Sequence, residues 1–241
     1  MGEMRSPPPS VNVRYFEKLA KKDFLRNLQT AYLSQRVALK HARTKSHFVR
    51  YFGSASRNTH VIEQVARTLL PSQVVDLAET QLARRIETSM IATDKATART
   101  QALLQAEAIT ALPEYLQRPL EVEAKCISPK VTRYLELILK ADRLMTYLEA
   151  LRLAGVIGTN LYDHQIAVAV RDLIAVPRCA FHLAIALRKR AAALESETAA
   201  KGAQRSKGLH PKEDQAPELS APASTDAAAS GTDTKNLAQA I

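Results

Sequence analysis

The chain has 241 residues and carries 34 Lys and Arg against 24 Asp and Glu, a formal net charge of +10. Seven glycines and no tryptophan, with abundant Ala, Leu and Arg, favour a mainly helical protein and argue against a β-sandwich or barrel. Two widely separated cysteines exclude a disulfide framework, and the opening MGEMRSPPPS lacks the apolar segment of a secretory signal, so we expect a cytoplasmic protein.

The excess of positive charge is concentrated in the first third of the chain. Residues 1–70 hold 13 Lys and Arg against 4 Asp and Glu. A surplus this localised favours a polyanionic partner, such as nucleic acid or an anionic lipid surface. The same charge could instead belong to a solvated helix face that keeps the protein soluble, so the charge count leaves both interpretations open.

Residues 1–11 contain a run of three prolines and are expected to form a flexible arm. A helical pattern follows from about residue 13 to residue 52, with a break expected within it. Gly53 is expected to end the pattern and GSASRN to form a loop. Within this pattern the stretch QRVALKHARTKSHFVR, residues 35–50, has five Lys and Arg and no acid. If this stretch is a helix, it has a basic stripe next to an apolar stripe. The residues of the basic stripe are Arg36, Lys40, Arg43, His47 and Arg50, and Lys45 points away from it.

The middle of the chain combines helices with one strand. We expect a short helix over residues 59–70 and a longer one over residues 74–112, which Pro113 ends. The stretch LEVEAKCI, residues 120–127, alternates apolar and charged side chains and predicts a β-strand. Ser128 as N-cap and Pro129 at the first helical position then open a helix to about residue 154, which Gly155 and Gly158 end.

The last helical region runs from about residue 160 to residue 195, and Pro177 is expected to kink or split it. Four polar side chains interrupt its most apolar part, residues 166–187, so we expect a buried helix pair and no membrane span. Residues 196–241 have almost no large apolar side chain and are expected to be disordered. The expected fold class is therefore mainly α: a single helical domain over residues 12–195, one short strand near 120–127 and a disordered C-terminal tail.

No constellation of residues indicates an enzyme. The chain has no Gly-rich phosphate loop, no paired-cysteine motif and no histidine spacing typical of a metal site. Asp142 stands in the middle of a predicted helix, where a structural pairing with a basic neighbour is the favoured interpretation. We therefore expect a protein without catalytic residues, cofactor or metal.

The stretch SPKVTRYLELILKADRLMTYLEALRLAGVIGTNLYDHQ, residues 128–165, resembles the AcaB-like family of regulators carried by conjugative plasmids and integrative elements. The resemblance lies in Ser-Pro opening a helix, a central apolar-x-x-Asp-x-Leu element and a closing Leu-x-x-x-Gly-x-Ile. It implies a DNA-binding transcriptional regulator that acts as a dimer. It also implies a strand followed by helices similar to ribbon-helix-helix proteins, in which strands of two subunits pair and enter the major groove.

If this chain follows the ribbon-helix-helix arrangement, the strand contributes Lys125 to the DNA contacts. The helix after the strand contributes Lys130 and Arg133. Glu121 and Glu123 would place unfavourable negative charge beside DNA, so we expect the strand to pair across a dimer or with another edge and not to read bases. The predicted contacts to double-stranded DNA are Arg36, Lys40, Arg43, Lys45, Arg50, Lys125, Lys130 and Arg133.

Two other functions remain open from the sequence. The chain could be a non-enzymatic helical accessory or scaffold protein of a conjugative element, whose basic face meets an acidic partner. A peripheral membrane protein is less favoured, because the apolar stripe beside the basic one is rich in Ala and poor in the bulky side chains that insert into a bilayer. We expect no membrane association.

Overall fold

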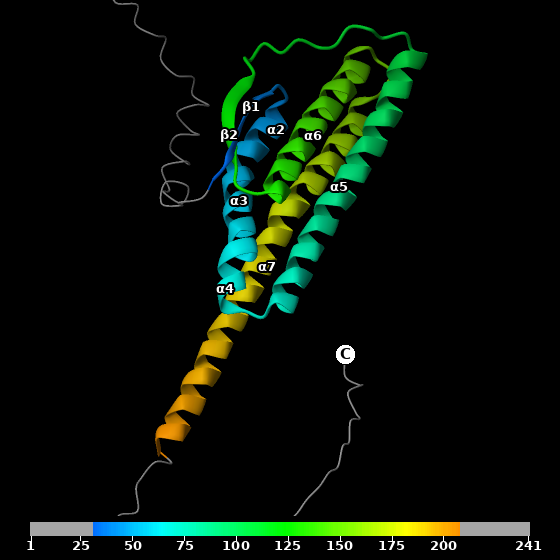
Figure 1. Ribbon diagram of the computed structural model, residues 1–241. Helices are drawn as coiled ribbons and strands as arrows, with labels where there is room; N and C mark the ends of the chain where they lie inside the picture. The colour runs from blue at the N-terminus through cyan, green and yellow to red at the C-terminus, as the bar shows by residue number, and fades with distance from the viewer. Residues whose placement is uncertain (1–30, 208–241) are drawn as a thin grey trace, which may run out of the picture. The chain divides into compact units, whose positions relative to one another are not determined.

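The structure is a computed structural model that describes residues 31–207. The described residues form a mainly α fold with two short strands, in the order shown in Figure 1. The elements are β1 (Leu33–Leu39), α2 (Ala42–His47), η1 (Phe48–Phe52), α3 (Gly53–His60), η2 (Val61–Val65), α4 (Ala66–Leu69), α5 (Ser72–Ala106), β2 (Leu120–Cys126), α6 (Pro129–Leu153) and α7 (Thr159–Lys207). The predicted fold class is confirmed, with one strand more than expected.

The two strands form an antiparallel sheet in which Arg36 lies opposite Glu123 and Val37 lies opposite Val122. Val37 and Leu39 of β1 face the core, whereas Arg36 and Ala38, which alternate with them, are exposed. The predicted strand at 120–127 is therefore confirmed as β2, and its partner is another edge within the same chain.

The prediction of a helical pattern between residues 13 and 52 is wrong for residues 33–39, which form β1. In that segment alternate side chains are buried, which is the period of a strand, because β2 supplies a pairing edge. The basic stripe predicted for residues 35–50 assumed a single helix. These residues include part of β1 and the start of the helical run, so the helical spacing between the basic residues does not apply across them. The expected arm at 1–11 and the first part of the expected helix lie outside the described residues.

From residue 42 to residue 69 the chain is helical without a break, because α2, η1, α3, η2 and α4 follow one another directly. The expected stop at Gly53 and the expected loop GSASRN are wrong. Gly53 has the helical backbone angles φ −63° and ψ −38°, and it begins α3. The two π-helical stretches η1 and η2 lie on either side of α3, and the Phe48 and Phe52 rings of η1 stack with centroids 4.7 Å apart.

The helices α5 and α6 run parallel, as three cross-helix pairs with the same sequence offset show. Arg133 pairs with Glu87 at 2.5 Å, Lys140 with Asp94 at 2.7 Å, and the Gln101 amide donates to the Tyr147 hydroxyl at 3.3 Å. Ser128 caps α6 as predicted, since its hydroxyl accepts from the backbone N–H of Val131 at 3.3 Å, and Pro129 is in the first turn.

After α6 the chain reverses at Gly155, whose φ of +77° is left-handed, and α7 then runs back along the other helices (Figure 1). Its contribution to the core extends from Ile166 to Ala191. The expected split at Pro177 is wrong, since α7 continues through that residue. The predicted boundary at residue 195 falls inside α7, and the part of the expected tail from 208 to 241 lies outside the described residues.

One hydrophobic core cluster joins the sheet to the helices. Its largest fully buried side chains include Leu39 of β1, Phe48 of η1, Leu82 of α5, Tyr134 of α6 and Leu173 of α7. Among residues 31–207, no helix is both long and apolar enough to span a bilayer. The core thus includes the residues on either side of α2, Leu39 and Phe48, together with Leu173 of α7, and the site below lies beside these elements.

Candidate nucleic-acid interface

The outer face of the sheet carries both signs of charge. Arg36 is exposed on β1 with Glu123 directly across the ladder, and Glu121 lies opposite Ala38. Lys125 on β2 is exposed, and its ammonium lies 4.7 Å from the ring centroid of Tyr32. Because the carboxylates alternate with the cations, this face gives little net attraction for a polyanion, as the sequence had indicated for Glu121 and Glu123.

Lys45 does not reach solvent. Its side chain is buried, with 7% of the residue exposed, and its ammonium donates to the backbone carbonyl of Arg118 at 2.8 Å. This contact ties α2 to the loop before β2, because a buried ammonium needs a hydrogen-bond acceptor. The assignment of Lys45 as a DNA contact is therefore not supported by its geometry.

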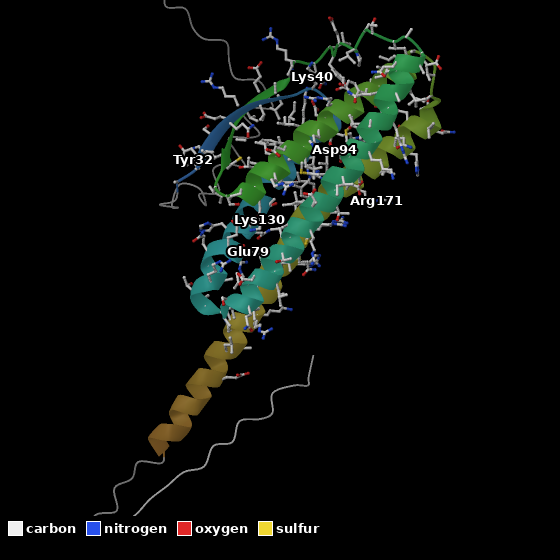
Figure 2. All side chains as sticks on the ribbon, turned by 45° about the vertical axis from the view of Figure 1, so that its right-hand side comes forward. Tyr32, Lys40, Glu79, Asp94, Lys130 and Arg171 are labelled. Carbon is white, nitrogen blue, oxygen red and sulfur yellow. The ribbon has the colours of Figure 1, made fainter. Side chains whose placement is uncertain are left out.

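Lys130 and Arg133 are paired with carboxylates of the same fold. The Lys130 ammonium lies 2.8 Å from Glu63 and 2.9 Å from Glu79, and Figure 2 shows Lys130 and Glu79 side by side between their helices. Arg133 is paired with Glu87. A phosphate would have to displace these carboxylates, so both residues serve the packing of α6 against α5 and its preceding helices.

Lys40 is exposed at the junction between β1 and α2. Its backbone N–H donates to the Asp142 carboxylate, as does the backbone N–H of His41 at 2.9 Å. The Thr44 hydroxyl also donates to Asp142. Asp142 is 6% exposed and projects from α6, so it holds the start of α2 in place. Its role is structural, as expected, although its partners are backbone amides and a hydroxyl and not a basic side chain.

His41 joins α2 to α7. It is the N-cap of α2, where its Nδ1 accepts from the backbone N–H of Arg43 at 3.2 Å, and its Nε2 lies 3.4 Å from the Tyr162 hydroxyl on α7. Burial lowers the pKa of His41 below its usual value, although the Asp142 carboxylate acts in the opposite direction. These contacts set the position of Arg43 relative to α7.

Arg43 and Arg50 are exposed, as predicted, and Arg57 continues the same side of the helical run. Exposed positions recur along it every three or four residues, at 43, 46, 50, 53 and 57. Residues 24–62 contain no Asp or Glu at all. Within the described part of the chain, none of these three arginines takes part in an ion pair.

The helix α7 carries a second row of cations that the sequence analysis did not single out. Arg171, Arg178 and Lys189 are exposed, and their spacings of seven and eleven residues place them on one face. Residues 173–194 contain no Asp or Glu. Figure 2 shows Arg171 well apart from Tyr32 and Lys40, so this row is separate from the sheet. The signal available in the sequence was the acid-free run of residues 173–194, which contains Arg178 and Lys189.

The two rows meet at a groove between α2 and α7 with a volume of about 580 Å³. Arg43 lines it from α2 and Arg171 and Arg178 line it from α7, and Asp163 is the acidic residue among its lining side chains. Ile166, Val170 and Ile174 form its floor. Three arginines around one carboxylate leave a net positive site that can attract an anion.

No group of three or more His, Cys, Asp or Glu side chains in the described part of the chain is placed to hold a metal ion.

Among solved structures, the chain is similar to the crystal structure of AcaB from uropathogenic E. coli, with a TM-score of 0.66 and 22% sequence identity. The chain shares the fold of AcaB. The similarity covers 70% of this chain and 88% of AcaB. No protein-family model matches the sequence, and no curated protein matches it. The resemblance to the AcaB-like family is thus supported by the likeness to AcaB at the level of the fold.

Proposed function

We propose that this protein is a DNA-binding transcriptional regulator of a mobile genetic element, and that it binds double-stranded DNA through the arginine face. The arginine face is the set of exposed cations Arg43, Arg50, Arg57, Arg171, Arg178 and Lys189. The single observation that supports this proposal is that most of these cations lie in helical stretches without Asp or Glu: residues 42–62 carry Arg43, Arg50 and Arg57, and residues 173–194 carry Arg178 and Lys189. Arg171 lies just before the second stretch, next to Asp172. By contrast, Lys130, Arg133 and Lys140 at α5–α6 are already neutralised.

The dimensions of the arginine face fit a duplex. At 1.5 Å per residue, Arg43 to Arg57 spans about 21 Å and Arg171 to Lys189 about 27 Å, a little less than the ~34 Å of one duplex turn. Contacts from Lys and Arg side chains to phosphates hold a protein on the duplex and do not distinguish one base pair from another. We therefore propose phosphate contacts, with the sheet contributing little because Glu121 and Glu123 lie among its cations.

The regulatory part of the proposal, including action as a homodimer, follows from the resemblance to the AcaB-like family. The proposed absence of catalysis follows from the sequence, which has no recognisable catalytic motif. The shared fold with AcaB supports the regulatory part. An accessory protein that binds an acidic partner is the second candidate, and the apolar floor of the groove is the observation that favours it.

The salt dependence of binding to a fluorescein-labelled duplex tests the proposal by anisotropy. Six phosphate contacts predict that log affinity falls with log salt at a slope of about −5. The triple variant R43Q/R50Q/R57Q should bind more weakly and reduce the slope to about −3, because three contacts are lost.

The matched control is R84Q/K95Q/R99Q, which removes three exposed cations from α5. This control should keep the wild-type slope. Binding that does not depend on salt, or an equal loss in both triple variants, would contradict the proposal, since net charge and not the arginine face would then account for binding.

A further inference from the structure

The groove between α2 and α7 has an apolar floor that phosphate contacts do not use. Ile166, Val170 and Ile174 follow one another at intervals of four residues along α7. Ile166 is buried, and the other two are half-buried. A duplex needs cations at its phosphates and gains nothing from aliphatic side chains beneath them. The floor therefore points to an occupant other than DNA.

The apolar stripe continues beyond the groove. Phe181 is 50% exposed and lies eleven residues after Val170, which returns it to the same face of α7 after three turns. Ile185 is half-buried one turn further on. From Ile166 to Phe181 the stripe is about 22 Å long. An α-helix of about 15 residues has this length, and it presents its own apolar side chains at the same spacing.

The charged residues that line the groove favour a bound helix with acidic side chains beside its apolar face. Arg43 stands on one side of the floor and Arg171 and Arg178 stand on the other, with Asp163 as the acid among the lining residues. A helix with Glu or Asp beside its apolar seam would place carboxylates near both rims. A lipid bilayer fits less well, because Ile166 and its neighbours form a floor between arginines and a flat surface does not enter a groove.

From these observations we propose that the groove between α2 and α7 binds an acidic amphipathic helix of a partner protein. The apolar seam of the helix packs on Val170, Ile174 and Phe181, and its flanking carboxylates pair with Arg43 and Arg178. The same arginines belong to the arginine face, so the helix and DNA compete.

Fluorescence anisotropy with a defined probe tests this proposal in the absence of DNA. The probe is a fluorescein-labelled synthetic helix of about 18 residues with leucines on one face and glutamates flanking them, long enough to cover the stripe. A control peptide of the same composition has its leucines spread around the helix. The full-length protein should bind the amphipathic peptide and bind the control peptide at least about tenfold more weakly, because only the former has a seam.

Two matched pairs of variants locate the contact. A167E places a carboxylate in the groove and A186E places one elsewhere on α7, both at exposed alanines. V170T makes the floor polar without a change of charge, and V168T makes the same change at a half-buried position outside the groove. We expect A167E to weaken peptide binding about tenfold or more and V170T to weaken it about threefold. A186E and V168T should stay close to wild type.

Equal affinity for the two peptides, or equal effects within each pair of variants, would overturn the proposal. The proposal would also be overturned, in favour of a lipid surface, if the wild-type protein floated with anionic vesicles and the A167E variant did not. Because the assay contains no DNA, its failure leaves the salt dependence of duplex binding as a separate result.

Discussion

Asp142 shows how one side chain can fix a site without touching a ligand. Its buried carboxylate accepts from two consecutive backbone N–H groups, those of Lys40 and His41, and from the Thr44 hydroxyl. These donors lie where the chain leaves β1 and begins α2. The position of Arg43 at the groove therefore depends on an acid about one hundred residues away in sequence.

We expect Asp142→Ala to destabilise the protein by about 2–4 kcal/mol, because it leaves buried donors without an acceptor. Asp94→Ala is the control, since Asp94 is exposed and paired with Lys140, and it should cost less than about 1 kcal/mol. Urea denaturation measures both. Similar free energies of unfolding for the two variants would show that Asp142 does not anchor α2.

His47 links stability to pH. It is 4% exposed, its Nε2 lies 2.6 Å from the Tyr134 hydroxyl, and burial lowers its pKa from 6.5 to about 4. Above pH 6.5 the ring is neutral in both states. Between pH 6.5 and 4 the unfolded chain binds the proton first, so the free energy of unfolding falls as the pH falls, by up to about 1.4 kcal/mol per pH unit.

The variant His47→Phe removes this titration. We expect its free energy of unfolding to fall less steeply than that of the wild type as the pH falls from 6.5 to 4, whatever its stability at neutral pH. Urea denaturation at several pH values measures the two slopes. Identical slopes would mean that His47 is not buried as a neutral ring.

Among the elements, the run from α2 to α4 departs most from expectation. Gly53 lies within it with helical backbone angles, is exposed, and would place an added Cβ in open space. Gly155 also has open space around it, but its φ of +77° disfavours any side chain. The same residue type therefore continues a helix at one position and ends one at the other.

These two glycines predict opposite effects of one substitution. Gly53→Ala should stabilise the protein by about 0.5–1 kcal/mol, since alanine loses less backbone entropy in a helix. Gly155→Ala should destabilise it by about 1 kcal/mol, because alanine is strained in the left-handed region. Thermal unfolding of both variants measures the difference. A loss of stability in Gly53→Ala would contradict the continuous helix.

Across the molecule, charge is sorted between two kinds of surface. At α5–α6 the cations Lys130, Arg133 and Lys140 face carboxylates and hold helices together. Among residues 31–207, the cations of the arginine face form no ion pair, and Asp163 is the acid that lines the groove beside them. The net charge of +10 therefore does not show where an anion is attracted. The cations of α5–α6 contribute little to this attraction, which is concentrated at α2, η1, α3 and α7.

Local chemistry in the sequence was enough to predict the mainly α class, the strand at 120–127 and the Ser128–Pro129 start of α6. Each depends on alternation, capping or composition within a few residues, and these act through short-range contacts. Arg43 and Arg50 were also found from sequence, because a helical stripe exposes them within α2 and η1.

Only the tertiary structure decided that residues 33–39 form a strand, that Lys45 is buried, and that Lys130 and Arg133 are already paired. The reason is physical: a strand needs a partner edge, and a cation binds whichever acid the fold brings within reach. Glu79 lies 51 residues from Lys130 and Glu123 lies 87 residues from Arg36. No local pattern around a cation records such distant neighbours, so the packing of the whole chain determines which positive charges remain free for a ligand.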